Sequence, residues 1–272
     1  MPKLFWDFRY NAAVQMRLRN KKIQKGKKMK LLLIRHGEPD YSIDSLTPKG
    51  WREAEYLSEK LVKMDLTDIY VSTMGRAKDT AAPTLQKLNR EAVECEWLRE
   101  FVKVQIHRPD AEKGKTRIAW DWMPGDWTKD ARLFSKDHWQ ENEIMKEGNA
   151  KAEYDRVTGC FDKLLAEHGY VRDGAVYRAE KSNCDTLVFF CHFGVIGVLL
   201  SHLLNTSPMI IWQGACALPT SVTTLVTEER QQGTAIFRML SFGDTSHLYV
   251  KGEEPSFAAR FCECYGSKEE RH

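Results

Sequence analysis

The chain has 272 residues, of which 42% are hydrophobic and 29% charged, and its formal net charge is +3. This apolar content is enough for a sizeable core and excludes a largely disordered chain, while ordinary Gly and Pro contents exclude collagen-like and low-complexity classes. The length corresponds to one large domain or one domain with an elaboration.

The charge is unevenly distributed. Residues 1–28 hold nine Lys or Arg residues and one acid, which gives this arm a net charge of +8 and leaves −5 for residues 29–272. An acidic body argues against nucleic-acid binding. The arm itself is open to three interpretations: a targeting or RNA-contacting segment, an amphipathic helix at a membrane surface, or a translated leader. The purine-rich codons required by residues 25–28, just before Met29, favour the leader and a start at Met29.

Cysteine usage and hydropathy bear on the compartment. The seven cysteines form no CxxC pair and no secretory signal is evident, which predicts a reducing, cytoplasmic setting. The most apolar stretch, 187–204, contains two His residues and two Gly residues. We therefore expect a strand, a turn and a helix there, and no membrane association.

From Lys30 onward, strand patterns alternate with helix patterns. Thr47 is a predicted N-cap with Pro48 at the first helical position, and other helices are predicted from their 3- and 4-residue apolar spacing. The predicted strands are 30–34, 68–71, 92–96, 186–191, 221–227 and 235–241, and the predicted helices are 48–64, 76–88, 150–168 and 193–204, followed by an irregular tail. This alternation predicts an α/β fold: a three-layer α/β/α sandwich around a mostly parallel sheet.

Residues 101–150 interrupt the alternation and hold four of the eight tryptophans. We interpret this segment as a cap inserted into a domain that spans residues 29–272. Packing of the tryptophans against the sheet is the favoured explanation, and an aromatic lining for a substrate is the alternative.

Charged side chains follow several predicted strands. Arg35 and His36 follow the first strand, Arg76 opens the helix after the second, Glu100 follows the third and His192 the fourth. Because ligands bind beyond the carboxyl ends of strands in such sheets, we expect these side chains to share one site. Two guanidinium groups suit a phosphate dianion, an imidazole can attack phosphorus, and a carboxylic acid can protonate a leaving oxygen.

Three segments together resemble the histidine phosphatase (phosphoglycerate mutase-like) superfamily. They are Leu32-Leu33-Ile34-Arg35-His36-Gly37-Glu38 with Leu46-Thr47-Pro48-Lys49-Gly50, then Ser72-Thr73-Met74-Gly75-Arg76-Ala77-Lys78-Asp79-Thr80-Ala81, and Phe189-Phe190-Cys191-His192-Phe193-Gly194. They occur in the family's order, and the resemblance covers about 30–248 without the insertion.

The resemblance implies a phosphohistidine mechanism without a metal or other cofactor. His36 is the implied nucleophile, and Arg35, Arg76 and His192 are the implied ligands of the phosphoryl oxygens. Glu100 stands where the mutase-like branch carries its general acid. Ser42 stands where the family often has an asparagine, and is the expected fourth phosphoryl ligand.

Departures from the family pattern favour a phosphatase over a mutase. Residues 39–41 differ from the mutase continuation, and no clear bisphosphoglycerate-holding segment follows Glu100. Phe193, in place of the common Gly after the second histidine, makes the pocket wall bulkier there. The expected activity is therefore hydrolysis of a small phosphorylated metabolite. The alternatives are phosphoryl transfer of the phosphoglycerate mutase type and a non-catalytic module that binds a phosphorylated ligand. The sequence predicts neither the substrate nor the oligomeric state.

Overall fold

The computed structural model describes residues 28–112, 114–258 and 262–267. Its centre is an eight-stranded sheet with the order β5-β4-β10-β1-β11-β12-β9-β8. The strands are β1 (Lys30–Arg35), β4 (Asp68–Ser72), β5 (Val93–Cys95), β8 (Tyr170–Asp173), β9 (Val176–Ala179), β10 (Thr186–Cys191), β11 (Val222–Gln231) and β12 (Thr234–Asp244). The predicted basic arm, 1–28, lies outside the described residues except for Lys28.

The sheet is parallel where the site residues lie. β1 pairs in parallel with β10, β10 with β4, and β4 with β5. β11 then runs antiparallel to β1, β12 to β11, β9 to β12 and β8 to β9. All strands except β11 and β9 consequently point the same way, and the predicted mostly parallel sheet is confirmed.

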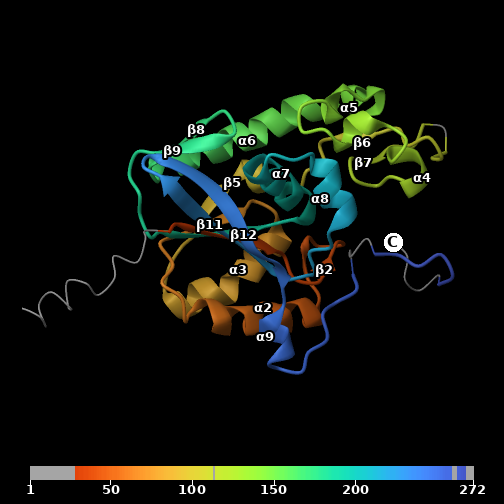
Figure 1. Cartoon of the computed structure of the whole chain (residues 1–272). Coiled ribbons are helices and arrows are strands. Elements are labelled where there is room, and N and C mark those ends of the chain that lie inside the picture. The colour runs from red at the N-terminus through yellow and green to blue at the C-terminus, as the bar shows by residue number, and fades with distance from the viewer. Residues whose placement is uncertain (1–27, 113, 259–261, 268–272) are drawn as a thin grey trace, which may run out of the picture.

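Helices cover both faces, as Figure 1 shows, with α2 (Pro48–Leu61) and α3 (Gly75–Leu88) on one side and α6 (Ala150–Glu167) and α7 (Phe193–Leu204) on the other. The alternating side chains of β1 explain the two layers. Leu32 and Ile34 belong to the apolar cluster under α2 and α3, whereas Leu31 and Leu33 belong to the larger cluster under α6 and α7. The predicted three-layer sandwich is therefore confirmed.

The predicted elements are found with shifted ends. Thr47 does cap α2, since its hydroxyl accepts a hydrogen bond from the Gly50 amide at 3.1 Å. The helix ends at Leu61, three residues before the predicted end. Three features have no counterpart among the predicted elements: the hairpin of β8 and β9, the helix α8 (Pro208–Gly214) and the short helix α9 (Ser246–Tyr249), which falls in the segment expected to be irregular.

Residues 101–150, which we call the cap, form short elements. They are β6 (Gln105–Ile106), β7 (Arg117–Ile118), α4 (Pro124–Trp127), α5 (Glu143–Glu147) and the 3-10 turns η2 (Ala131–Phe134) and η3 (Trp139–Glu141). Three of its tryptophans, Trp120, Trp122 and Trp139, are buried in the larger apolar cluster, and Trp127 packs against that cluster. These four tryptophans therefore pack in or against the apolar core, as the favoured explanation predicts.

The smaller elements around the first strand include β2 (Pro39–Asp40) and β3 (Ser45–Leu46), which pair with each other, and η1 (Glu96–Leu98), which precedes Glu100. The apolar stretch 187–204 divides into β10 and α7. No helix within the described ranges is long and apolar enough to cross a membrane.

Candidate active site

The two histidines are brought together by neighbouring strands. β1 and β10 pair with Arg35 opposite Cys191, and the His36 amide donates to the Cys191 carbonyl oxygen at 3.0 Å. His36 and His192 therefore leave the sheet side by side, with ring centroids 5.2 Å apart and ring planes at 54°. Both rings are buried, at 2% and 0% exposure.

The hydrogen bonds of His36 define its reactive nitrogen. Nδ1 lies 2.7 Å from the carbonyl oxygen of Gly37, so Nδ1 carries the proton and donates it. Nε2 is then left with its lone pair. Burial, followed by the charges of Arg35 and Arg76, holds the pKa of His36 well below its ordinary value, which keeps the ring neutral. His36 can thus act as a nucleophile through Nε2.

His192 is held by a residue of the neighbouring strand β4. Its Nε2 lies 2.8 Å from the hydroxyl of Ser72, and its Nδ1 has no hydrogen-bond partner among the described residues. Burial, then the neighbouring charges of His36, Arg76 and Arg35, lowers the pKa of His192 well below its usual value. The unpaired nitrogen is a group that can bind a phosphoryl oxygen.

The two arginines are fixed by different partners. An Nη1 group of Arg35 donates to the carbonyl oxygen of Ala217, and the guanidinium lies 5.8 Å from the ring centroid of Phe193. Arg76 opens α3 and forms an ion pair with Asp44 at 2.6 Å. Both side chains are almost fully buried, so they place two positive charges beside the imidazoles in a medium where charge is weakly screened.

Glu100 reaches the site through the end of η1. Its Oε1 accepts hydrogen bonds from the amides of Phe101 at 2.9 Å and Val195 at 3.2 Å. Burial raises the pKa of Glu100 above its ordinary value, although these amides and both arginines act in the opposite direction. Burial thus favours the protonated form of this carboxyl group, which is the form that can protonate a leaving oxygen.

The structure thus places Arg35, His36, Arg76, Glu100 and His192 at one edge of the sheet. Ser42 is not linked to them by any hydrogen bond in the described part of the chain. Its hydroxyl donates to Asp40 on its own loop, and its side chain is exposed. A phosphoryl contact from Ser42 stays a prediction.

Several supporting residues had no assigned role in the sequence. The Thr80 hydroxyl accepts from the Gly37 amide at 2.9 Å and donates to the Arg76 carbonyl oxygen at 2.7 Å, which ties the nucleophile loop to α3. Ser72 and Thr80 both lie in the recognised second segment, so this segment was a signal for them. Asp44 and Tyr41, whose ring lies 5.4 Å from the Arg76 guanidinium, gave no comparable signal.

The cap contributes one side chain next to the site. A Cβ atom at position 194 would lie 2.3 Å from the indole of Trp120 and 2.6 Å from Oε1 of Glu100. Glycine at this position therefore allows the indole and the acid to pack directly on α7. Trp120 also contacts Trp212, whose Nε1 donates to the Gly194 carbonyl oxygen at 2.9 Å.

Other polar groups of the cap are paired with each other. Asp121 forms ion pairs with Arg108 and Arg117, and Arg132 forms them with Asp130 and Glu143. Among the described residues, no group of three His, Cys, Asp or Glu side chains is arranged to hold a metal ion.

Comparison with known proteins defines the class. The family model of the histidine phosphatase superfamily (branch 1) matches residues 31–238, so the chain belongs to this superfamily. A probable phosphatase of Schizosaccharomyces pombe is 25% identical over 235 residues, which cover 81% of this chain and 95% of that protein. A 2,3-bisphosphoglycerate-dependent phosphoglycerate mutase of Thermoplasma acidophilum is 34% identical, but over 80 residues that cover 26% of this chain and 40% of that protein.

Solved structures share the fold. A phosphoserine phosphatase mutant of Entamoeba histolytica in complex with phosphoserine matches with a TM-score of 0.54 and 20% identity, over 81% of this chain and 99% of that one. A phosphoglycerate mutase of Bacillus anthracis matches with a TM-score of 0.56 and 18% identity, over 84% and 98% of the two chains. These neighbours include both phosphatases and mutases, and at this level of identity the likeness shows the fold alone.

Proposed function

We propose that the protein is a metal-independent phosphomonoesterase that hydrolyses a small phosphorylated metabolite through a phosphohistidine at His36. The observation that supports this most directly is the hydrogen bond from Nδ1 of His36 to Gly37, which leaves Nε2 unprotonated beside two arginines. The probable phosphatase of S. pombe, matched over nearly its full length, supports hydrolysis.

In the first step, Nε2 of His36 attacks phosphorus and the bond between phosphorus and the ester oxygen breaks. Arg35 and Arg76 neutralise charge on the phosphoryl oxygens, and His192 binds one of these oxygens by a hydrogen bond through Nδ1. Glu100 gives its proton to the leaving oxygen, which departs as an alcohol. In the second step, Glu100 takes a proton from water, the water oxygen attacks phosphorus, and the bond between phosphorus and Nε2 breaks to release phosphate.

Measuring phosphate release from a panel of phosphorylated metabolites tests the proposal. We expect turnover by the wild type, and in His36→Ala loss of both turnover and the acid-labile phosphoenzyme. His107→Ala is a matched control, because this histidine is exposed and lies in the cap. Phosphatase activity that persists in His36→Ala would refute the phosphohistidine step.

Phosphoryl transfer of the mutase type is the second candidate, and the 34% identity with the T. acidophilum mutase favours it over one segment. Product analysis separates the two activities. Free phosphate in amounts equal to the alcohol product supports hydrolysis, whereas an isomerised substrate without phosphate release supports the mutase. Tight binding of phosphorylated ligands without either product would indicate a non-catalytic module.

A further inference from the structure

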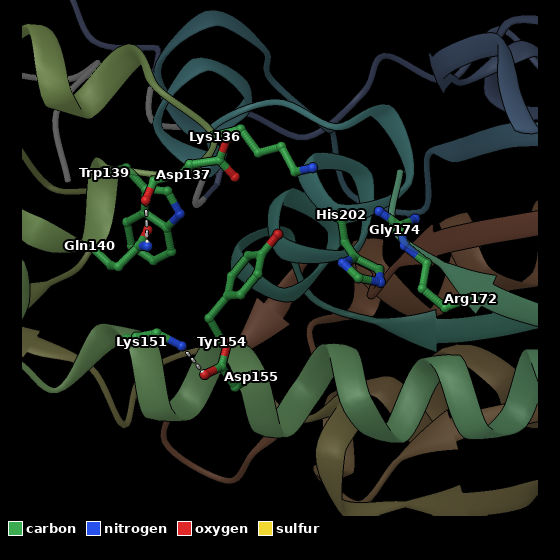
Figure 2. Close-up of a pocket in the computed structure, with 10 residues that line it drawn as sticks. All are labelled: Lys136, Asp137, Trp139, Gln140, Lys151, Tyr154, Asp155, Arg172, Gly174 and His202. Carbon is green, nitrogen blue, oxygen red and sulfur yellow. Dashed lines mark hydrogen bonds and ion pairs between the residues drawn. The ribbon is translucent and has the colours of Figure 1, made fainter. Parts of the chain in front are cut away.

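A second hollow lies at the opposite end of α7 from the active site. Its volume is about 340 Å³, within the range of small-molecule sites. Its walls come from the cap, α6, the β8–β9 turn and α7 (Figure 2), and the lining residues are Lys136, Asp137, Trp139, Gln140, Lys151, Tyr154, Asp155, Arg172, Gly174 and His202. His202 is ten residues after His192, roughly 15 Å along the helix. The hollow is therefore separate from the candidate active site.

The side of the hollow toward α7 is cationic. Lys136 is exposed and forms no ion pair among the described residues, and Figure 2 shows its chain extending toward His202 and Arg172. Arg172 donates through Nη2 to the amide oxygen of Asn205 at 2.8 Å, and its Nη1 has no partner in the described part of the chain. Neither cation forms an ion pair in the described part of the chain. Arg172 packs on the ring of Tyr177, 4.9 Å from its centroid, and the nearby carboxylate of Asp162 is held by Tyr177 and His202.

The acidic groups at the hollow are placed differently. Asp155 is paired with Lys151. Asp137 lies at the end away from Arg172 (Figure 2) and forms no ion pair among the described residues. The two ends of the hollow therefore differ in charge, and a ligand bound there is oriented with its anionic group toward Arg172.

Aromatic rings form the wall between these ends. Tyr154 contacts Trp139 edge to face, with centroids 5.3 Å apart, and His202 lies 6.4 Å from Tyr154. The rings are fixed from behind: the Tyr154 hydroxyl lies 3.1 Å from that of Ser201, and Nε2 of His202 lies 2.9 Å from Asp162. A planar apolar body can pack on this wall at little cost in side-chain entropy.

We propose that this hollow is a second binding site, for a small organic anion that joins an aromatic body to one carboxylate or phosphoryl group. The anionic group lies between Lys136 and Arg172, and the aromatic body packs on the partly buried ring of Tyr154, which Trp139 supports from the core. A carboxylate and a phosphoryl group can each accept hydrogen bonds from Lys136 and Arg172, so the test includes one probe with each group.

Calorimetry on the full-length protein, without and with saturating orthovanadate as a phosphate analogue for the candidate active site, tests the proposal. The probes are benzoate and phenylphosphonate. The control probes are benzyl alcohol, which has the ring without the charge, and inorganic phosphate, which has the charge without the ring. We expect one of the two aromatic anions to bind with a dissociation constant of about 1 mM or tighter. Both control probes should bind at least about tenfold more weakly.

Substitutions then locate the site. Lys136→Gln and Arg172→Gln should each weaken binding of the aromatic anion about tenfold, the effect of one charge-assisted hydrogen bond. Lys146→Gln is the matched control, since this lysine is exposed on α5 outside the hollow, and it should leave binding unchanged.

Two results would overturn the proposal. One is a failure of the probes: neither aromatic anion binds, or benzyl alcohol or inorganic phosphate binds as tightly as the aromatic anion. The other is binding that Lys136→Gln leaves intact. Because Lys136 is exposed, its substitution tests the site even where Arg172→Gln impairs folding. Neither result depends on phosphatase activity, so the test is independent of the proposed function.

Discussion

Phosphoryl transfer requires a neutral imidazole at His36 and a protonated carboxyl group at Glu100. Burial shifts the two pKa values in opposite directions and favours both of these forms. The nucleophile has to be neutral, and burial and nearby arginines lower the pKa of His36. The acid has to retain its proton, and burial raises the pKa of Glu100. One buried environment thus favours the uncharged form of each group, which is the form that the first step uses.

Substitution of Glu100 by Gln tests the assigned acid. In the wild type, kcat/KM should fall as pH drops through the lowered pKa of His36, and fall as pH rises through the raised pKa of Glu100. Glu100→Gln should lower kcat/KM, which reports the first step, roughly 10²–10⁴-fold on alkyl phosphates. The loss of kcat/KM should be much smaller on p-nitrophenyl phosphate, whose leaving group needs no proton. It should also remove the alkaline limb. Equal losses on both substrates would assign the acid role elsewhere.

At the scale of elements, the sequence predicted the strands that carry the site but not the partners that orient it. β1 and β10 are continuous apolar runs followed by charged residues, and this pattern is local. Asp44, which pairs with Arg76, and Ala217, which accepts from Arg35, lie in loops without such a pattern. Their contacts join positions 32 and 182 residues apart, so only the folded chain defines them.

The missed hairpin of β8 and β9 has a similar explanation. β8 (Tyr170–Asp173) has one fully buried side chain, followed by partly buried and exposed ones, so its sequence lacks the alternation typical of a strand. Its stability comes from pairing with β9, and that of β9 from pairing with β12. Such antiparallel extensions depend on tertiary packing more than on strand propensity.

The contact between the cap and α7 makes a prediction for Gly194. In Gly194→Ala, the new methyl group would displace the Trp120 ring and the Glu100 carboxylate, so we expect kcat to fall at least about tenfold, with destabilisation of about 1–3 kcal/mol. Gly159→Ala in α6 is the matched control, because nothing lies within 4 Å of its Cβ position. The control should be neutral or stabilising by about 0.5–1 kcal/mol. Steady-state kinetics and denaturant unfolding measure both effects.

At the scale of the whole molecule, the nucleophile is connected to the far end of the chain. The His36 carbonyl oxygen accepts from the Thr220 amide at 3.1 Å, and the Thr220 hydroxyl lies 3.0 Å from Nε2 of His247 in α9. Burial lowers the pKa of His247 from 6.5 to about 4. His247 is thus held in the fold as a buried, neutral side chain.

This buried histidine makes stability depend on pH. Between pH 6.5 and about 4 the unfolded chain binds a proton at His247 that the folded chain does not, so the free energy of unfolding falls as pH falls. The loss is about 1.4 kcal/mol per pH unit. From pH 6.5 to 5, the wild type should therefore lose about 1.5 kcal/mol more than His247→Gln, because the unfolded histidine is already half protonated at pH 6.5.

Denaturant unfolding at both pH values measures this difference. His107→Gln is the control, since His107 is exposed and no loss beyond that of the wild type is expected. A wild type and a His247→Gln variant with the same pH dependence would show that His247 is not buried in its neutral form.

The hydrogen bonds between β1 and β10 also determine the lifetime of the backbone conformation at the nucleophile. The His36 amide is bound to Cys191 in the middle of an eight-stranded sheet, with strands hydrogen-bonded on both sides of β1. Amide protons in such a place exchange with solvent through openings close to global unfolding, whereas those of loops exchange through local opening. The nucleophile consequently shares the lifetime of the sheet itself, and thermal fraying of the cap or of the outer hairpin leaves its backbone in place.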